Sequence, residues 1–217
     1  MAIAFPVAQA NLGDLLPIQS VSWALSRQQE VSGLGTGEMI VADLGAPLWE
    51  GEVALRPLLH TDARAMMAKI DAMDGGVQSM YLANPLGWWP KMDPKGTAYG
   101  SAEPVILAVD ANRKELRFDD LPAGYRLSAG DMFAVEYGSG RRGLYRLVGD
   151  VVADGTGRTA LVEVRPHLRP GIVTGLAATF ARPAAKVKIM PGSVSSSMHS
   201  PNRTRIAFRV RQTLAAG

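Results

Sequence analysis

The chain has 217 residues, 47% of them hydrophobic and 20% charged, and a formal net charge of +3. This length can bury a substantial core in one large or two small domains. Cysteine is absent, which excludes disulfides, thiol chemistry and cysteine metal sites. His60, His167 and His199 lie far apart and show no zinc-binding spacing, so we expect no metal and no cofactor.

No apolar run approaches the roughly 20 residues that cross a bilayer. The N-terminus also lacks a basic segment before a long apolar core, which argues against a secretory signal. We therefore expect a soluble protein without membrane insertion.

The charge is divided unevenly along the chain. After Glu163 there is no acidic residue and there are nine basic ones, whereas the first 163 residues carry 20 acidic and 14 basic side chains. Such a division is typical of contact with an acidic surface, either nucleic acid or a neighbouring copy, and a solvated basic strand is an equally good interpretation. Aromatic residues of the kind that stack bases do not accompany these charges, so we expect nucleic acid to be an unlikely partner.

The N-terminal third is typical of antiparallel strands. Residues 18–28 alternate apolar and polar side chains, which predicts a half-buried strand with Trp23 in the core. The glycine-rich residues 33–37 precede a β pattern rather than a helix, so we interpret them as a hairpin turn and not as a phosphate-binding loop. Residues 38–45 and 48–57, on either side of Pro47, then predict two more strands.

One helix is predicted, beginning at Thr61 as the N-cap and ending before Gly75. Met66, Ile70 and Met73 share one face of it. A methionine stripe can be an adaptable binding surface, but the charged opposite face favours packing of this stripe on a sheet.

A long loop follows the next predicted strand, VQSMYLANP. It runs through LGWWPKMDPKGTAYGSAEP and contains Trp88, Trp89 and Tyr99. Long loops without regular structure are often functional, and adjacent tryptophans are costly to leave in water. These rings are candidates either for a partner or sugar platform or for a plug between two domains.

Residues 105–183 hold six short apolar runs separated by turn signals, which predict a small β-barrel or sandwich. Its carboxylates Asp119, Asp120, Asp131 and Asp154 each lie beside a turn residue, so turn chemistry explains them. No G-x-S-x-G nucleophile motif is present. We therefore predict no catalytic residues and no enzymatic activity.

The last segment predicts a strand, a serine-rich loop over residues 193–200 and a final strand. In the final strand Ile206, Phe208 and Val210 alternate with basic side chains, which predicts one buried and one basic face. The basic residues Arg203, Arg205, Arg209 and Arg211 are candidates for interaction.

The expected fold is mainly β with one clear helix (α+β). We expect one β-sheet domain with a packed helix, formed by residues 1–90 and completed by the C-terminal hairpin in residues 184–217. A small β-barrel or sandwich domain, residues 91–183, is inserted into it.

Several short motifs occur in a characteristic order. They are the Trp-bearing VSWALSRQQ, a D-x-G-x-x-x-W pattern from Asp43 to Trp49, DGG before YLANP, L-x-A-G-D from Leu127, a D-G-x-G turn from Asp154, and VRPHLR from Val164. Together they resemble the distal tail and related minor tail proteins of long-tailed phages and prophages, over residues 20 to 213. The long WWP loop departs from that pattern.

This resemblance implies a non-enzymatic virion structural protein, made in the bacterial cytoplasm and incorporated into the tail. Its partners would be copies of itself, in an oligomeric ring at the junction of tail tube and tip, and other tail proteins. Two alternatives are a carbohydrate-binding module that uses Trp88, Trp89 and Tyr99, and an OB-like nucleic-acid-binding protein that uses the basic C-terminal segment.

Overall fold

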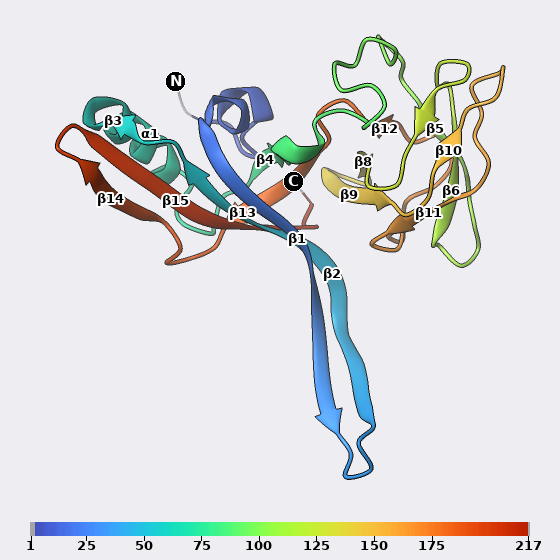
Figure 1. Ribbon diagram of the computed structural model, residues 1–217, viewed down its shortest axis with the longest axis horizontal. Helices are drawn as coiled ribbons and strands as arrows, with labels where there is room; N and C mark the ends of the chain where they lie inside the picture. Colours follow the sequence, from blue (N-terminus) through green and yellow to red (C-terminus); the bar gives the residue numbers. More distant parts are fainter. Residues whose placement is uncertain (1–2, 217) are drawn as a thin grey trace.

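The computed structural model describes residues 3–216, and the fold is mostly β with few helices. Two sheets lie side by side along the long axis (Figure 1). The prediction of a mainly β fold with one α-helix is confirmed.

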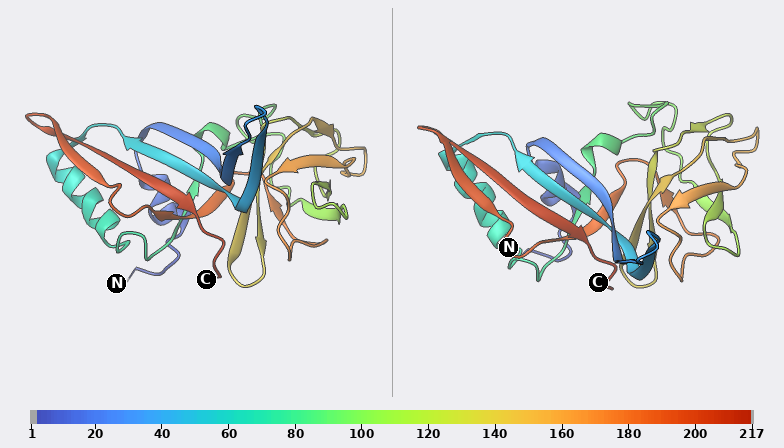
Figure 2. Two further views of the ribbon diagram at one scale, coloured as in Figure 1. Left: turned by 90° about the horizontal axis from the view of Figure 1, so that it is seen from below. Right: turned by 60° about the horizontal axis from the view of Figure 1, so that its bottom comes forward.

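The first sheet has seven strands, in the order β1-β2-β15-β13-β4, with β14 and β3 also paired to β15. Its strands are β1 (Ile18–Gly33), β2 (Met39–Leu55), β3 (Leu58–Leu59), β4 (Met80–Ala83), β13 (Ala184–Ile189), β14 (Ser195–Ser200) and β15 (Arg203–Gln212). The helix α1 (His60–Asp71) and the 3-10 turns η1 (Gln9–Asn11) and η2 (Gly13–Leu15) lie on one face of this sheet (Figure 2).

The second sheet contains six strands in the order β12-β8-β9-β11-β6-β5, all from the middle of the chain. They are β5 (Val105–Val109), β6 (Glu115–Asp119), β8 (Met132–Tyr137), β9 (Arg141–Leu147), β11 (Val162–Arg165) and β12 (Ala178–Thr179). A separate pair is formed by β7 (Arg126–Leu127) and β10 (Val151–Val152), and η3 (Pro85–Gly87) follows β4.

The chain leaves the first sheet at β4 and returns to it at β13. These two strands are antiparallel neighbours, with Ala83 opposite Ala184. The two ends of the intervening segment therefore lie next to each other. The proposed domain boundaries at residues 91 and 183 stay predictions.

The buried apolar residues form two clusters, one centred on each sheet, and Met132, Ala134 and Leu144 of β8 and β9 belong to the first. In the first, Ile206, Phe208 and Val210 are at most 1% exposed and pack in one cluster with Trp23 and the helix face that carries Ile70. The predicted burial of this face of the final strand is confirmed. The predicted core packing of the methionine stripe is also confirmed, since Met73 is buried and Met66 packs against the cluster. In the second core Phe118, Phe133 and Phe180 are fully buried and in edge-on or tilted contact, an arrangement aromatic rings favour.

Three expectations about individual elements are wrong. Instead of two strands separated at Pro47, β2 is continuous, because Pro47 lies beside shifts in the β1–β2 register where no ladder hydrogen bond is required of it. The helix begins at His60 rather than after Thr61, and its N-cap, Leu59, makes no side-chain cap. His60 instead contacts the Thr204 hydroxyl at 2.7 Å, which attaches the helix start to β15.

The serine-rich segment is the third correction. Residues 195–200 form strand β14 rather than a loop, with Ser196 opposite Ile206 of β15. Pairing with β15 satisfies the backbone groups along one edge of this segment, so a regular strand forms without any apolar alternation.

Candidate assembly surfaces and a small pocket

The rings of the long loop do not form one platform. Tyr99 is only 5% exposed and packs in the second core, in edge-on contact with Trp89 at 6.2 Å. Trp88 alone is well exposed, at 42%. The burial of Tyr99 leaves it no surface for a sugar platform, and Trp89 and Tyr99 both pack in the second core rather than between the two cores.

A buried carboxylate orders this loop. Asp93 is 5% exposed and accepts hydrogen bonds from the backbone N–H of Thr97 at 2.9 Å and of Tyr99 at 2.7 Å. These bonds close a turn on which the ring of Trp89 packs. The sequence gives a signal for it, because Asp followed by Pro and Gly favours turns.

Gly96 allows Trp89 to pack against this turn. It has φ +68°, and a Cβ there would lie 2.3 Å from Trp89 Cζ3. Gly96→Ala should therefore destabilise the protein by about 1 to 3 kcal/mol more than a glycine replacement without such a contact. Gly100→Ala is the matched control, because Gly100 also has positive φ (+57°) and open space around its Cβ position. Chemical denaturation of both variants measures the difference, and equal losses would contradict a packing role for Trp89.

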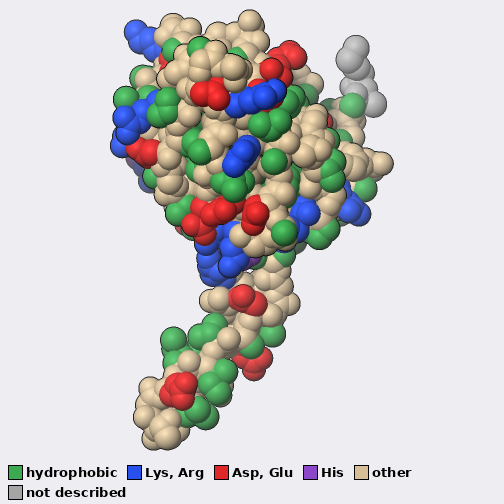
Figure 3. Space-filling model, turned by 90° about the vertical axis from the view of Figure 1, so that its right-hand side faces the viewer, with side chains coloured by type: hydrophobic (Ala, Val, Ile, Leu, Met, Phe, Trp, Pro, Cys, Tyr) green, Lys and Arg blue, Asp and Glu red, His purple; other side chains and the backbone are tan. Residues whose placement is uncertain are grey.

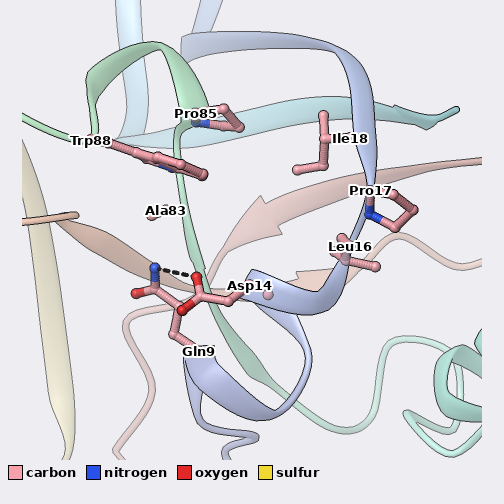
Figure 4. Close-up of a pocket in the computed structure, with 9 residues that line it drawn as sticks. Gln9, Asp14, Leu16, Pro17, Ile18, Ala83, Pro85 and Trp88 are labelled. Atoms are coloured by element: carbon pink, nitrogen blue, oxygen red, sulfur yellow. Dashed lines mark hydrogen bonds between the residues drawn. The ribbon is translucent and has the colours of Figure 1, made fainter.

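Trp88 forms one wall of a pocket of about 230 Å³ (Figure 4). The guanidinium of Arg182 lies over its ring at 4.5 Å and donates a hydrogen bond to Asp14 at 2.8 Å. Gln9 also donates to Asp14, at 3.0 Å. The other walls are mostly apolar: Leu16, Pro17, Ile18, Ala83 and Pro85. The pocket thus combines an aromatic wall with one amide and one carboxylate. It could not be predicted from the sequence because its walls come from two segments, residues 9–18 and 83–88, that lie far apart along the chain.

The four candidate arginines are on the final strand, but they are not equivalent. Arg211 forms an ion pair with Glu50 at 3.1 Å on the neighbouring strand, and Arg203 donates to the carbonyl of Pro57 at 3.0 Å. Arg205 and Arg209 are exposed, and no ion pair to either occurs within residues 3–216. Part of the basic C-terminal charge is therefore used within the chain, and Arg203, Arg205 and Arg209 remain on the surface.

A two-stranded arm is the most prominent surface feature. We use this name for residues 28–46, the outer halves of β1 and β2 with their connecting turn, which project from the body (Figure 1). Its exposed apolar side chains are Val31, Leu34, Met39, Ile40, Val41 and Leu44, with exposures from 43% to 66%. Glu30, Glu38 and Asp43 are the only charged residues in the arm. The space-filling view shows these apolar and acidic side chains along its length (Figure 3).

Turn chemistry accounts for carboxylates of the second sheet. Asp154 accepts hydrogen bonds from the Thr156 hydroxyl and from the N–H groups of Thr156 and Arg158, and these bonds lower its pKa. Asp131 accepts from the N–H of Ser128 at 2.7 Å and of Lys91 at 2.8 Å, although burial raises its pKa.

No cluster of side chains suited to a metal ion occurs among residues 3–216, and none of the described helices has the length and apolar character to cross a membrane. The chain matches no known protein-family model and no curated protein.

Proposed function

We propose that this chain is a non-enzymatic structural protein of a phage or prophage tail that assembles into an oligomeric ring at the junction of tail tube and tip. Its partners are copies of itself and other tail proteins, and it reaches the virion tail after synthesis in the bacterial cytoplasm. The tail assignment rests on the sequence resemblance, and self-association rests on the arm.

The arm supports assembly for a physical reason. An isolated two-stranded ribbon is marginally stable in water at best. Six of its apolar side chains are exposed, and none of them belongs to either apolar core of the described residues. Contiguous apolar surface of this kind marks a site of protein association. A second molecule that covers the arm would both stabilise the ribbon and bury these side chains.

Light scattering coupled to size-exclusion chromatography tests the proposal. We expect a concentration-dependent shift from monomer to one discrete oligomer, and electron microscopy of that fraction should show closed rings. A chain that stays monomeric at every concentration, also with other tail proteins added, would contradict the proposed function.

The pocket at Trp88 favours a second candidate function, binding of a sugar ring at the host surface. An aromatic wall beside an amide and a carboxylate can stack on one face of a sugar and bind its hydroxyls. Trp88→Ala should then abolish glycan-array binding, whereas Leu86→Ala should not, because Leu86 is 79% exposed and does not line the pocket. If the wild type binds no glycan, this candidate fails.

A further inference from the structure

The arm needs a partner surface that is apolar in part and positively charged. Between residues 28 and 46 there are three acidic side chains and no lysine or arginine. Acidic and apolar residues are mixed along the ribbon. Three successive cross-strand pairs are Gln29 with Asp43, Glu30 with Ala42, and Val31 with Val41. Both faces of the ribbon are exposed, so a partner can contact either side chains or a strand edge.

The hairpin formed by β14 and β15 has these complementary properties. β14 pairs only with β15 among the described strands, so its outer edge offers unpaired backbone groups to another strand. Met198 on β14 is 75% exposed. The end of this hairpin also carries Arg203 and Arg205, both exposed, and no acidic residue.

One molecule cannot bring these two surfaces together. The arm and the β14–β15 hairpin project from the body in different directions and end far from each other (Figure 1). The hairpin that receives an arm must therefore belong to a second copy. Neighbouring strands alternate in direction from β1 through β2 and β15 to β14, so β14 is antiparallel to β1. The arm bends away from this sheet (Figure 1), so a second copy that presents β14 antiparallel to the arm is rotated relative to the first.

We propose that the arm of one copy adds, through its β1 strand, to the free edge of β14 in the next copy. Backbone hydrogen bonds would supply affinity, as in other cases of strand addition. Glu30 and Glu38 would lie near Arg203 and Arg205, while Met198 would be covered by apolar side chains of the arm. The contact joins two different surfaces, so each copy can both donate and receive an arm, a head-to-tail arrangement that forms a ring when the rotation between neighbouring copies closes. This inference rests on the proposed self-assembly and names the surfaces that form it.

Cysteine cross-linking tests the contact directly, because the chain has no cysteine of its own. Ser32→Cys places a thiol on the arm and Ser197→Cys places one on β14, and both positions are exposed. With a short thiol-to-thiol cross-linker, the mixture of the two variants should give a covalent dimer, and each variant alone should not. A mixture of Ser32→Cys with Ser101→Cys, an exposed position in the long loop, is the control and should give no covalent dimer.

Charge reversal gives a second, independent measurement. Arg203→Glu with Arg205→Glu should weaken association about tenfold or more, and so should Glu30→Lys with Glu38→Lys, because each places like charges together. Mixing the two double variants should restore an arm-to-hairpin contact between them. Cross-linking of Ser32→Cys alone would overturn the proposal in favour of arm-to-arm contacts. Wild-type assembly without any dimer from the mixture would overturn it too, yet would leave the ring proposal intact. A wild type that never assembles would overturn both.

Discussion

Replacing Phe208 with alanine should lower the free energy of unfolding by about 3 to 5 kcal/mol. Phe208 is 1% exposed at the centre of the first core, and its strand pairs there with β2, with Val53 as the opposite residue. Truncation would remove a whole aromatic ring and leave a cavity that a sheet with fixed ladder hydrogen bonds can fill only in part. Urea unfolding monitored by circular dichroism measures the loss.

Arg209→Gln is the matched control. Arg209 is the next residue of the same strand and points to the opposite, exposed face. Its neutralisation should change stability by less than about 0.5 kcal/mol, as is usual for exposed positions. A large loss in the control with a harmless Phe208→Ala would mean that the two faces of β15 are assigned the wrong way round.

Removing the arm should abolish self-association and leave the fold intact. Residues 28–46 can be replaced by Asn-Gly, so that a short turn rejoins the strands near the Ser26–Leu48 pair. No arm side chain belongs to either apolar core. The midpoint of unfolding of the monomer should therefore change little, whereas the oligomer should disappear in light scattering.

A variant of unchanged length tests whether the apolar side chains of the arm, rather than the mere presence of residues 28–46, are needed for association. Val31→Ser with Val41→Ser keeps both strands and removes one opposed apolar pair from the arm. It should weaken association without abolishing it. If the shortened protein still assembles as the wild type does, the arm is not the assembly surface, and the ring would have to form through other surfaces.

Much of the fold can be predicted from sequence because it depends on alternation within single strands. The final strand is the best example, since a period of two residues determines which side chains are buried whatever strand lies beside it. The helix face with Ile70 and Met73 follows in the same way from a period of 3.6.

The features that could not be predicted depend on neighbours distant in the sequence. β14 has no apolar pattern, and only its pairing with β15 makes it a strand. The arm has the composition of an ordinary core hairpin. It lies outside the body because β15 pairs with β2 only over Glu50–Ala54, and the ribbon farther out, over residues 27–44, is exposed. Local composition carries no information about where a partner strand ends.

The adjacent pairing of β4 and β13 has a consequence for how such a chain can diversify. The segment of residues 84–183 between them begins and ends at one antiparallel pair, with Ala83 opposite Ala184. An insert with neighbouring ends can be lengthened, trimmed or exchanged for another module without shifting the register of its host sheet. The host sheet with its arm can thus stay constant in evolution while the segment varies, provided that the contacts of Met132, Ala134 and Leu144 with the first core are kept.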